Sequence, residues 1–110
     1  MYHRGSVYWG DLRPVVGSEQ DGVRPVLIVQ NDVGNKHAPT VIVAPLTCNL
    51  HQSKPLVTHV TTYLPNLQRS VILLEQIRTI DKTRLGKYIT DLDHVTMQRV
   101  NQGLLRSLGL

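Results

Sequence analysis

The strongest constraint on the fold is a series of short runs that are almost entirely apolar. They cover residues Val26–Gln30, Thr40–Ala44 and Ser70–Leu74, and β-branched residues and leucine dominate each of them. A run of this length is short for a helix, and its composition favours a strand that is buried on both faces or in a barrel wall. The second run continues through Pro45 to Thr47. The core must therefore be built mainly from short strands.

Two further segments predict strands with an exposed face. Residues Gly5–Arg13 are rich in β-forming residues, and a strand there places Val7 and Trp9 on one face. Residues Val57–Thr61 alternate as V-T-H-V-T, which indicates an exposed strand with His59 at the surface. We expect loops or turns at residues 31–39, 48–54 and 63–69, and a single helical turn capped by Asp81 at residues 81–86, followed by a brief strand at residues 87–90.

A polar loop bounded by Gly17 and Gly22 precedes the first apolar run. Both glycines can adopt positive φ and let the backbone reverse tightly. Pro25 restricts the residue before it to extended conformations. Arg24 should therefore enter its strand with the guanidinium group pointing in a fixed direction, beside the polar donors of the loop. This combination suits the binding of a phosphate.

The hydrophobic period changes near the C-terminus. Between Asp93 and Ser107 apolar residues recur at spacings of three and four, with Asp91 or Asp93 available as cap and Gly109 as stop, so we predict a helix. Gly103 inside it predicts close packing. The apolar positions are Met97, Val100, Leu104, Leu105 and Leu108. Several short strands and one terminal helix predict a mostly antiparallel small β-barrel with a helix laid on it.

Length and composition predict one domain, 1–110, without a disulfide or metal staple. A chain of 110 residues buries roughly 65% of the surface that it exposes when unfolded. The single cysteine, Cys48, cannot form an internal disulfide, and the five histidines show no zinc-binding spacing. We expect no metal and no cofactor. No signal peptide and no run of about 18 apolar residues is evident, so we expect a cytoplasmic protein with no membrane span.

The charge balance favours an anionic partner. Twelve Lys and Arg face eight Asp and Glu, which gives a formal net charge of +4 and a pI near 9.6. Nucleic acid or an acidic protein segment would suit such a chain. The four tyrosines and one tryptophan are too few for an extended stacking platform, so a nucleic acid would be held at few points.

Three motifs in a fixed order make the chain recognisable. Residues 17–32 read G-S-E-Q-D-G-V-R-P-V-L-I-V-Q-N-D, residues 39–47 read P-T-V-I-V-A-P-L-T, and residues 70–82 read S-V-I-L-L-E-Q-I-R-T-I-D-K. Together they resemble the MazF/PemK family of toxin endoribonucleases from toxin-antitoxin systems, over almost the whole chain. The resemblance implies an SH3-like barrel with a C-terminal α-helix, and a homodimer whose groove binds single-stranded RNA and cuts it at short sequences.

The resemblance also implies roles for individual residues. Arg24 and Thr47 occupy the positions of the family's catalytic pair, and Ser18 and Gln76 occupy positions that contact RNA in relatives. Some members carry an acidic residue at the position of Glu75. Some members also carry an arginine where this chain has Leu73, so a mechanism that relies on that arginine does not fit. The predicted RNA-binding residues are Ser18, Gln20, Gln76 and Arg78.

The chemistry of RNA is compatible with these residues. The ribose 2′-OH can attack the adjacent phosphate without a metal, giving a 2′,3′-cyclic phosphate and a free 5′-OH. Arg24 offers a planar fork of donors to the phosphoryl oxygens, and Thr47 adds a hydroxyl donor worth a factor of about 10² to 10³. By residue type, Glu75, Glu19 and Asp21 are candidate proton acceptors.

Alternatives remain open at this stage. The same barrel could poison DNA gyrase by docking without chemistry, or it could be a simple RNA-binding module. Arg78 could serve a structural role by pairing with a carboxylate. If the family function applies, we expect the basic groove also to bind an acidic antitoxin protein (MazE-like), whose disordered segment folds on binding and blocks the site.

Overall fold

The computed structural model describes residues 1–17, 19, 22–48, 56–66 and 68–110. The predictions for Ser18, Gln20 and Asp21, and most of the expected loop at residues 48–54, lie outside the described residues. No described helix combines the length and the apolar character needed to cross a lipid bilayer.

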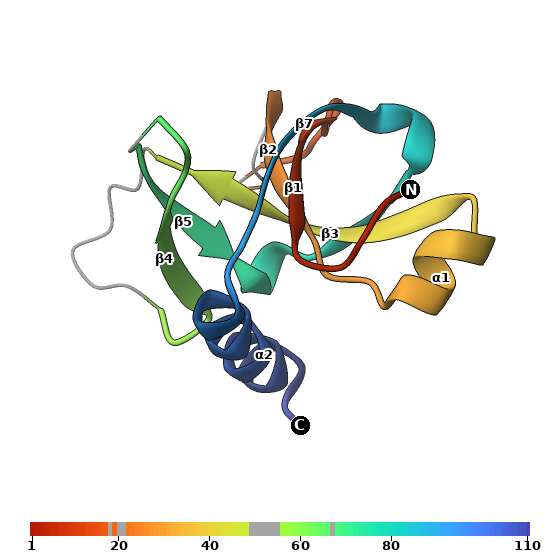
Figure 1. Ribbon diagram of the computed structural model, residues 1–110. Coiled ribbons are helices and arrows are strands. Elements are labelled where there is room, and N and C mark those ends of the chain that lie inside the picture. Colours follow the sequence, from red (N-terminus) through yellow and green to blue (C-terminus); the bar gives the residue numbers. More distant parts are fainter. Residues whose placement is uncertain (18, 20–21, 49–55, 67) are drawn as a thin grey trace.

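Antiparallel strands form a curled sheet that a C-terminal helix covers (Figure 1). The described strands make one 7-stranded sheet in the order β4-β5-β3-β2-β1-β7, with β6 pairing separately with β3. The predicted mostly β fold, an antiparallel barrel with a C-terminal helix, is confirmed. The strands are β1 (Ser6–Asp11), β2 (Val23–Ile28), β3 (Thr40–Thr47), β4 (His59–Tyr63), β5 (Arg69–Leu73), β6 (Arg78–Asp81) and β7 (Leu85–Asp91). The helices are α1 (Asp32–His37), α2 (His94–Leu108) and the short 3₁₀ helices η1 (Leu74–Gln76) and η2 (Lys82–Arg84).

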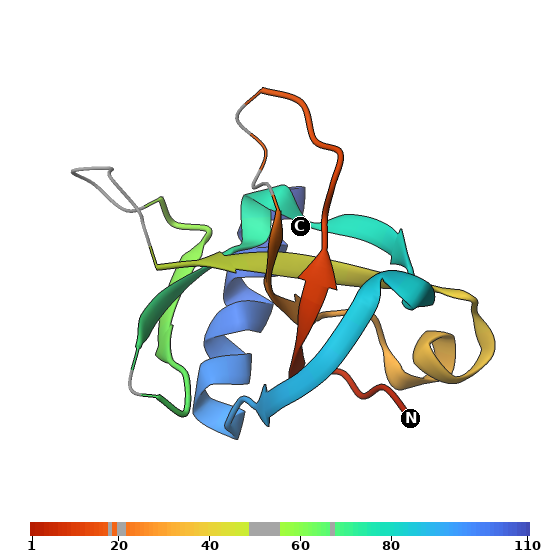
Figure 2. The ribbon, with the colours of Figure 1, turned by 90° about the horizontal axis from the view of Figure 1, so that it is seen from above.

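The long strand β3 joins the two parts of the sheet. Its first half pairs with β6, its middle with β2, and its last residues, Leu46 and Thr47, with β5. Figure 2 shows β3 running across the whole width of the molecule beneath β1 and β2. Pro45 is tolerated in this strand although it cannot donate a hydrogen bond to a neighbouring strand. The end of β3 is consequently the point where β2, β5 and the turn into β6 converge.

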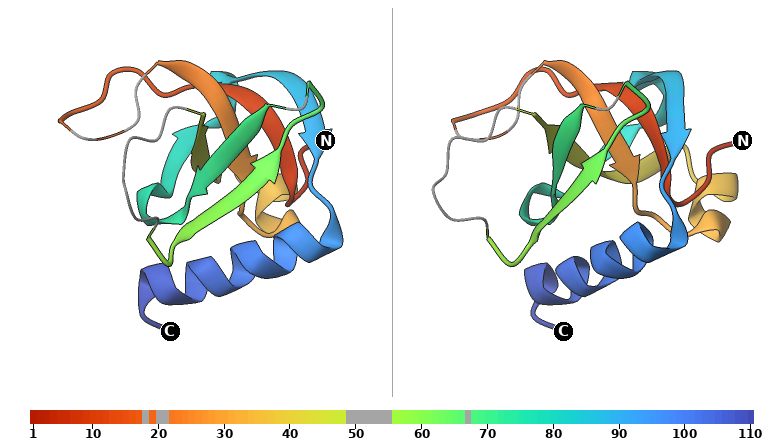
Figure 3. Two further views of the ribbon diagram at one scale, coloured as in Figure 1. Left: turned by 90° about the vertical axis from the view of Figure 1, so that its left-hand side faces the viewer. Right: turned by 60° about the vertical axis from the view of Figure 1, so that its left-hand side comes forward.

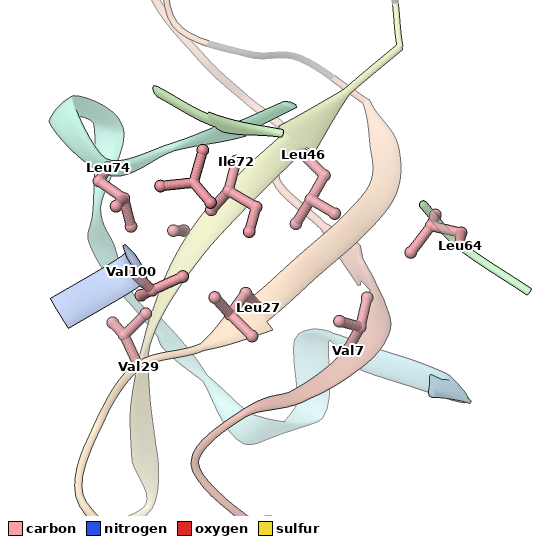
Figure 4. Packing of buried hydrophobic residues seen from close by; sticks show 10 residues of the cluster. Val7, Leu27, Val29, Leu46, Leu64, Ile72, Leu74 and Val100 are labelled. Atoms are coloured by element: carbon pink, nitrogen blue, oxygen red, sulfur yellow. The ribbon is translucent and has the colours of Figure 1, made fainter. Parts of the chain in front are cut away.

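Side chains of the central strands fill two cores on opposite faces of the sheet. In β2, Leu27 points into one core while Val26 and Ile28 point into the other, as the alternation of a strand requires. Burial on both faces explains why Val26, Leu27 and Ile28 are all apolar, and it confirms the prediction that this run is buried on both faces. Figure 4 shows the first core, which contains Val7, Leu27, Val29, Ala44, Leu46, Val60, Leu64, Ile72, Leu74 and Val100. The second core contains Leu12, Val26, Ile28, Val41, Val43 and Ile80.

Helix α2 closes the first core from the side of β4 and η1 (Figure 3). Asp93 caps its start by accepting the backbone N–H of Thr96, and Gly109 ends it in the left-handed conformation with φ of 71°. Both caps agree with the prediction. Gly103 is needed for close packing, because a Cβ atom there would lie 2.3 Å from Cδ1 of Leu74.

Two local predictions were wrong. The expected loop at residues 31–39 contains helix α1, because the side chain of Asn31 caps it by accepting the backbone N–H of Gly34. Asn35 is buried there and donates to the backbone carbonyl of Gln30. His59 was expected at the surface, yet only 1% of its side chain is exposed, since the imidazole turns toward η1 and meets Glu75.

Candidate active site

The register of β2 and β3 brings Arg24 and Thr47 to adjoining positions. Val26 pairs with Pro45 and Ile28 with Val43 in this antiparallel ladder. Continuing the same register past Val26 and Pro45 places Arg24 opposite Thr47, on the face that carries Val26 and Pro45. Side chains at opposite positions of an antiparallel pair have Cβ atoms roughly 4.5–5.5 Å apart. The predicted catalytic pair therefore occupies one face of the sheet at the end of β3.

The backbone around Arg24 is held on both sides. Arg24 is half-buried and pairs with Gly10 of β1, while its own strand continues into the double-sided core. A Cβ atom at position 10 would lie 2.9 Å from Cγ2 of Val26, so glycine lets β1 approach β2 closely here. On the other side, Thr47 is 5% exposed and pairs with Val71 of β5. Both predicted catalytic residues thus project from rigid strands.

A pocket of about 250 Å³ lies beside this pair, and it gathers four of the predicted site residues. Its wall includes Pro45, which lies on the same face of β3 as Thr47. The remaining wall comes from the end of β1, the first loop, η1 and the start of β6. The lining residues are Leu12, Glu19, Pro45, Glu75, Gln76, Ile77 and Arg78.

The carboxylate of Glu75 has a hydrogen-bond partner on each oxygen. Oε1 accepts the hydroxyl of Thr58 at 3.0 Å, and Oε2 lies 2.8 Å from Nε2 of His59. The side chain of Glu75 is 30% exposed, so it still reaches the pocket. Thr58 and His59 were missed as site residues from the sequence. The signal available was weak, since V-T-H-V-T fits an ordinary exposed strand equally well.

Glu19 stands in the first loop, on another part of the pocket wall. Its Oε1 accepts the backbone N–H of Val16 at 2.8 Å, which closes a local turn. The two glycines that bound the loop have φ of 60° at Gly17 and 81° at Gly22, as their roles in tight turns predict. Two of the three candidate proton acceptors, Glu19 and Glu75, therefore line one pocket, and the third, Asp21, lies outside the described residues.

Three arginines gather around the end of β1. Arg78 donates from Nη1 to the carbonyl of Leu12 at 3.2 Å. The sequence had left open a structural role in which Arg78 pairs with a carboxylate, and the partner found here is a backbone carbonyl instead. Arg84 donates to the carbonyl of Asp11 at 3.2 Å. The side chain of Arg13 binds the carboxylate of Asp11, and these hydrogen bonds hold the pKa of that carboxyl well below its usual range. These three arginines form a cationic edge next to Leu12, and Arg78 among them lines the pocket.

Fold and pocket together define a class of protein. It is a small curled antiparallel barrel with a polar cleft, lined by two carboxylates and an arginine, and the strand ends that carry Arg24 and Thr47 lie beside it. This set of groups fits phosphodiester chemistry on a nucleic acid. Of the predicted RNA-binding residues, Gln76 and Arg78 line the cleft, and Ser18 and Gln20 lie outside the described residues.

Comparison with known proteins assigns the family. The model of the PemK-like, MazF-like toxins of type II toxin-antitoxin systems matches residues 3–108. This span includes all three sequence motifs. The chain therefore belongs to the PemK/MazF toxin family, as the resemblance of its motifs predicted.

Individual relatives agree with this assignment. The chain is 54% identical to Endoribonuclease EndoA of Bacillus subtilis (strain 168) over 110 residues, covering 97% of this chain and 94% of that protein. It is 29% identical, with a TM-score of 0.82, to an endoribonuclease solved in complex with its cognate antitoxin from Mycobacterial species, covering 100% of this chain and 97% of that one. MazF from Deinococcus radiodurans, 23% identical, shares the fold with a TM-score of 0.83 over 99% of this chain and 97% of that one.

Proposed function

We propose that this chain is a metal-independent endoribonuclease toxin that cleaves single-stranded RNA at short sequences. Membership of the toxin family and 54% identity to a protein named Endoribonuclease EndoA support the activity. The observation that carries the proposal is the β2–β3 register: continued two residues past Val26 and Pro45, it leads to Arg24 and Thr47, beside a pocket that contains Glu19 and Glu75.

In the proposed reaction the ribose supplies its own nucleophile. The 2′ oxygen attacks the adjacent phosphorus while its proton passes to a carboxylate, and the bond from phosphorus to the 5′ oxygen breaks. The products are a 2′,3′-cyclic phosphate and a 5′-OH, whose oxygen gains a proton from water. Arg24 binds the phosphoryl oxygens with its planar fork of donors, and Thr47 donates its hydroxyl to the same charge. Because the nucleophile is intramolecular, no metal-bound water is required.

Two carboxylates are placed to accept the 2′-OH proton. Glu75 and Glu19 line the same pocket, and in each of them at least one oxygen accepts a hydrogen bond from the protein. Glu75 belongs to η1, between the ordered strands β5 and β6, whereas Glu19 belongs to a loop. Catalytic groups on rigid elements are positioned more accurately than groups on loops. We therefore assign the proton acceptor to Glu75 and place Glu19 on the facing wall.

The proposed partners follow from charge and family. A net charge of +4 suits RNA, and it equally suits an acidic antitoxin segment that occupies the cleft and excludes RNA. One similar structure was solved with its cognate antitoxin, which supports such a partner for this chain. A homodimer and a cytoplasmic location complete the proposal.

The decisive experiment measures RNA cleavage in EDTA by the wild-type protein and by Arg24→Ala and Arg24→Lys. Wild type should cut single-stranded RNA, and Arg24→Ala should lose at least about 10² of the rate, because a preorganised donor to the developing charge contributes this much. Arg24→Lys keeps the charge but loses the bidentate fork, so it should fall between the two.

Substrates and targets supply the controls. A strand with a 2′-deoxy nucleotide at the cut position should stay intact, since it lacks the nucleophile. Folded Arg24→Ala that cleaves as fast as wild type would refute the proposal. A wild-type protein that leaves RNA whole would select one of the other functions: inhibition of DNA supercoiling indicates a gyrase poison, and RNA binding alone indicates a binding module.

A further inference from the structure

The buried side chain of His59 has no part in the reaction described so far. It stands at the start of β4, and only 1% of its side chain is exposed. Both ring nitrogens have partners. Nδ1 lies 3.2 Å from the backbone nitrogen of Leu56, and Nε2 lies 2.8 Å from Oε2 of Glu75. The imidazole therefore bridges the entry to β4 and the wall of the pocket.

The contact with Leu56 determines which tautomer of His59 is present. A backbone N–H can only donate, so Nδ1 must accept and carries no proton. The ring proton then resides on Nε2, from which it is donated to Oε2 of Glu75. The opposite tautomer would lose both contacts. The backbone thus holds the histidine in the one neutral form that can donate to the carboxylate.

Thr58 supplies a second, independent donor to the same carboxylate. Its hydroxyl lies 3.0 Å from Oε1 of Glu75, and its side chain is 9% exposed. The carbonyl of Thr58 accepts the N–H of Leu74 at 3.2 Å, which joins the turn before β4 to η1 through the main chain. Thr58 in the turn before β4 and His59 at the start of β4 therefore bind one oxygen each, so the plane of the carboxylate is fixed as well as its position.

We propose that His59 is a positioning residue for the reaction: together with Thr58 it orients the Glu75 carboxylate toward the 2′-OH of bound RNA. This inference rests on the proposed function, in which Glu75 accepts the proton of that hydroxyl. An ionised carboxylate offers about four acceptor directions, and the two protein donors occupy one at each oxygen. The remaining directions can accept the substrate proton from a group that does not have to reorganise during the reaction.

Two amide substitutions separate the contacts of His59. In His59→Asn the amide lies near the former Nδ1, so it keeps the partner of Leu56 but falls short of Glu75. In His59→Gln the amide nitrogen reaches the former Nε2 and restores the donor to Glu75. Loss of one hydrogen bond to a charged group corresponds to about a tenfold change. His59→Asn should therefore lower kcat about tenfold with a smaller change in KM, and His59→Gln should recover most of this loss.

A double-mutant cycle with Glu75→Ala distinguishes positioning from a structural role. A residue that acts through Glu75 has nothing left to position once that side chain is removed. Single-turnover cleavage should fall about tenfold on His59→Asn in the wild-type background and less than about twofold in the Glu75→Ala background. Equal losses in both backgrounds would overturn the inference, as would a wild-type rate for His59→Asn. The exposed His94 on α2 gives the matched control, and His94→Asn should cleave as wild type does.

Thr58 provides a second route if the His59 variants do not fold. Thr58→Val removes the hydroxyl at nearly constant shape, whereas Thr58→Ser keeps it. The Val variant should slow cleavage and the Ser variant should not, and the slowing should again vanish in the Glu75→Ala background. The activity of Arg24→Ala distinguishes failure of the proposed function from failure of the positioning role. If Arg24→Ala cleaves RNA normally, the proposed function is refuted. If Arg24→Ala is inactive but the effects of His59→Asn and Glu75→Ala are independent, only the positioning role of His59 is refuted.

Discussion

At the scale of single residues, the cleft depends on polar side chains that the fold holds in one orientation. Glu75 binds Thr58 and His59, Arg78 binds the carbonyl of Leu12, and Glu19 binds the N–H of Val16. Among these residues only Glu75, Arg78 and Glu19 were predicted as site residues from the sequence. A hydrogen bond joins particular atoms, so its partners become evident only when the chain is folded.

Two substitutions of Thr47 distinguish the contribution of its hydroxyl from that of its branched shape. Thr47→Val keeps the branched side chain at a position that is 5% exposed, while Thr47→Ser keeps the hydroxyl. We expect Thr47→Val to lose about 10² to 10³ in kcat, because one donor to the developing charge is removed. Thr47→Ser should retain cleavage within about tenfold. Circular dichroism of both variants checks folding, and a Val variant as active as the Ser variant would contradict a role for the hydroxyl.

Asp93 makes the stability of α2 sensitive to acid. Its carboxylate accepts the N–H of Thr96 at 2.7 Å, and this hydrogen bond lowers the pKa of Asp93 below its usual value of 3.8. A lowered folded-state pKa contributes stability above the unfolded-state pKa, and this is lost as the pH falls through the folded-state value. Asp93→Asn keeps a capping side chain that does not titrate. Urea unfolding between about pH 5 and pH 2 should therefore depend less on pH in Asp93→Asn, and parallel curves for the two proteins would contradict the cap.

At the scale of elements, β3 and η1 decide where the chemistry lies. The end of β3 carries Thr47 beside β2 and β5, and η1 begins where β5 ends. Helix α2 supports η1 from behind through the contact between Gly103 and Leu74. The helix, although it contributes no residue to the cleft, thereby fixes the position of the turn that presents Glu75 and Gln76.

Filling the space at Gly103 should disturb both stability and the cleft. In Gly103→Ala the new methyl group would lie 2.3 Å from Cδ1 of Leu74, and overpacking of this kind costs about 1–3 kcal/mol in the free energy of unfolding. The better helix propensity of alanine offsets about 1 kcal/mol of this cost. Urea denaturation measures the balance. Ser107→Ala removes the hydroxyl that donates to the carbonyl of Leu74 at 2.8 Å. This variant weakens the attachment of α2 to Leu74 without adding volume. A Gly103→Ala protein more stable than wild type would show that Leu74 moves aside freely.

At the scale of the whole molecule, the chain carries a net positive charge, and a cationic edge lies beside the cleft. The net charge is +4, and three arginines lie at the end of β1: Arg78 and Arg84 donate to backbone carbonyls there, and Arg13 to the carboxylate of Asp11. Counterions leave RNA when such side chains approach its phosphates, so salt opposes binding. The same field would attract an acidic antitoxin segment.

Binding of RNA should therefore weaken as the salt concentration rises. A single-stranded RNA with one 2′-deoxy nucleotide at the cut position measures affinity without cleavage. If Arg13, Arg78 and Arg84 each contact one phosphate, the logarithm of the binding constant should fall with the logarithm of the salt concentration at a slope of about −2. Fluorescence anisotropy between about 50 and 200 mM salt measures this slope. Arg13→Gln, on the cationic edge, should make it shallower, and an affinity independent of salt would contradict the electrostatic account.

Much of the fold could be predicted because its causes are local. Short apolar runs predict buried strands, Asp93 and Gly109 predict the limits of α2, and Gly103 predicts close packing. Helix α1 was missed, since its Asn31 cap resembles the turn residues of a loop. The burial of His59 was missed for a different reason, because alternation in a strand indicates which residues share a face but not what covers that face.

The sequence by itself determined the strand runs, the helix caps, the family motifs and the identity of Arg24, Thr47, Glu19, Glu75, Gln76 and Arg78 as candidates. Each of these depends on neighbours a few residues away or on a motif. Only the tertiary structure decided that Val26 pairs with Pro45, so that the strand ends carrying Arg24 and Thr47 adjoin, and that Glu75 contacts a histidine 16 residues away. These pairings depend on how the sheet curls, because register and closure bring distant atoms within hydrogen-bonding distance, and no local pattern encodes that distance.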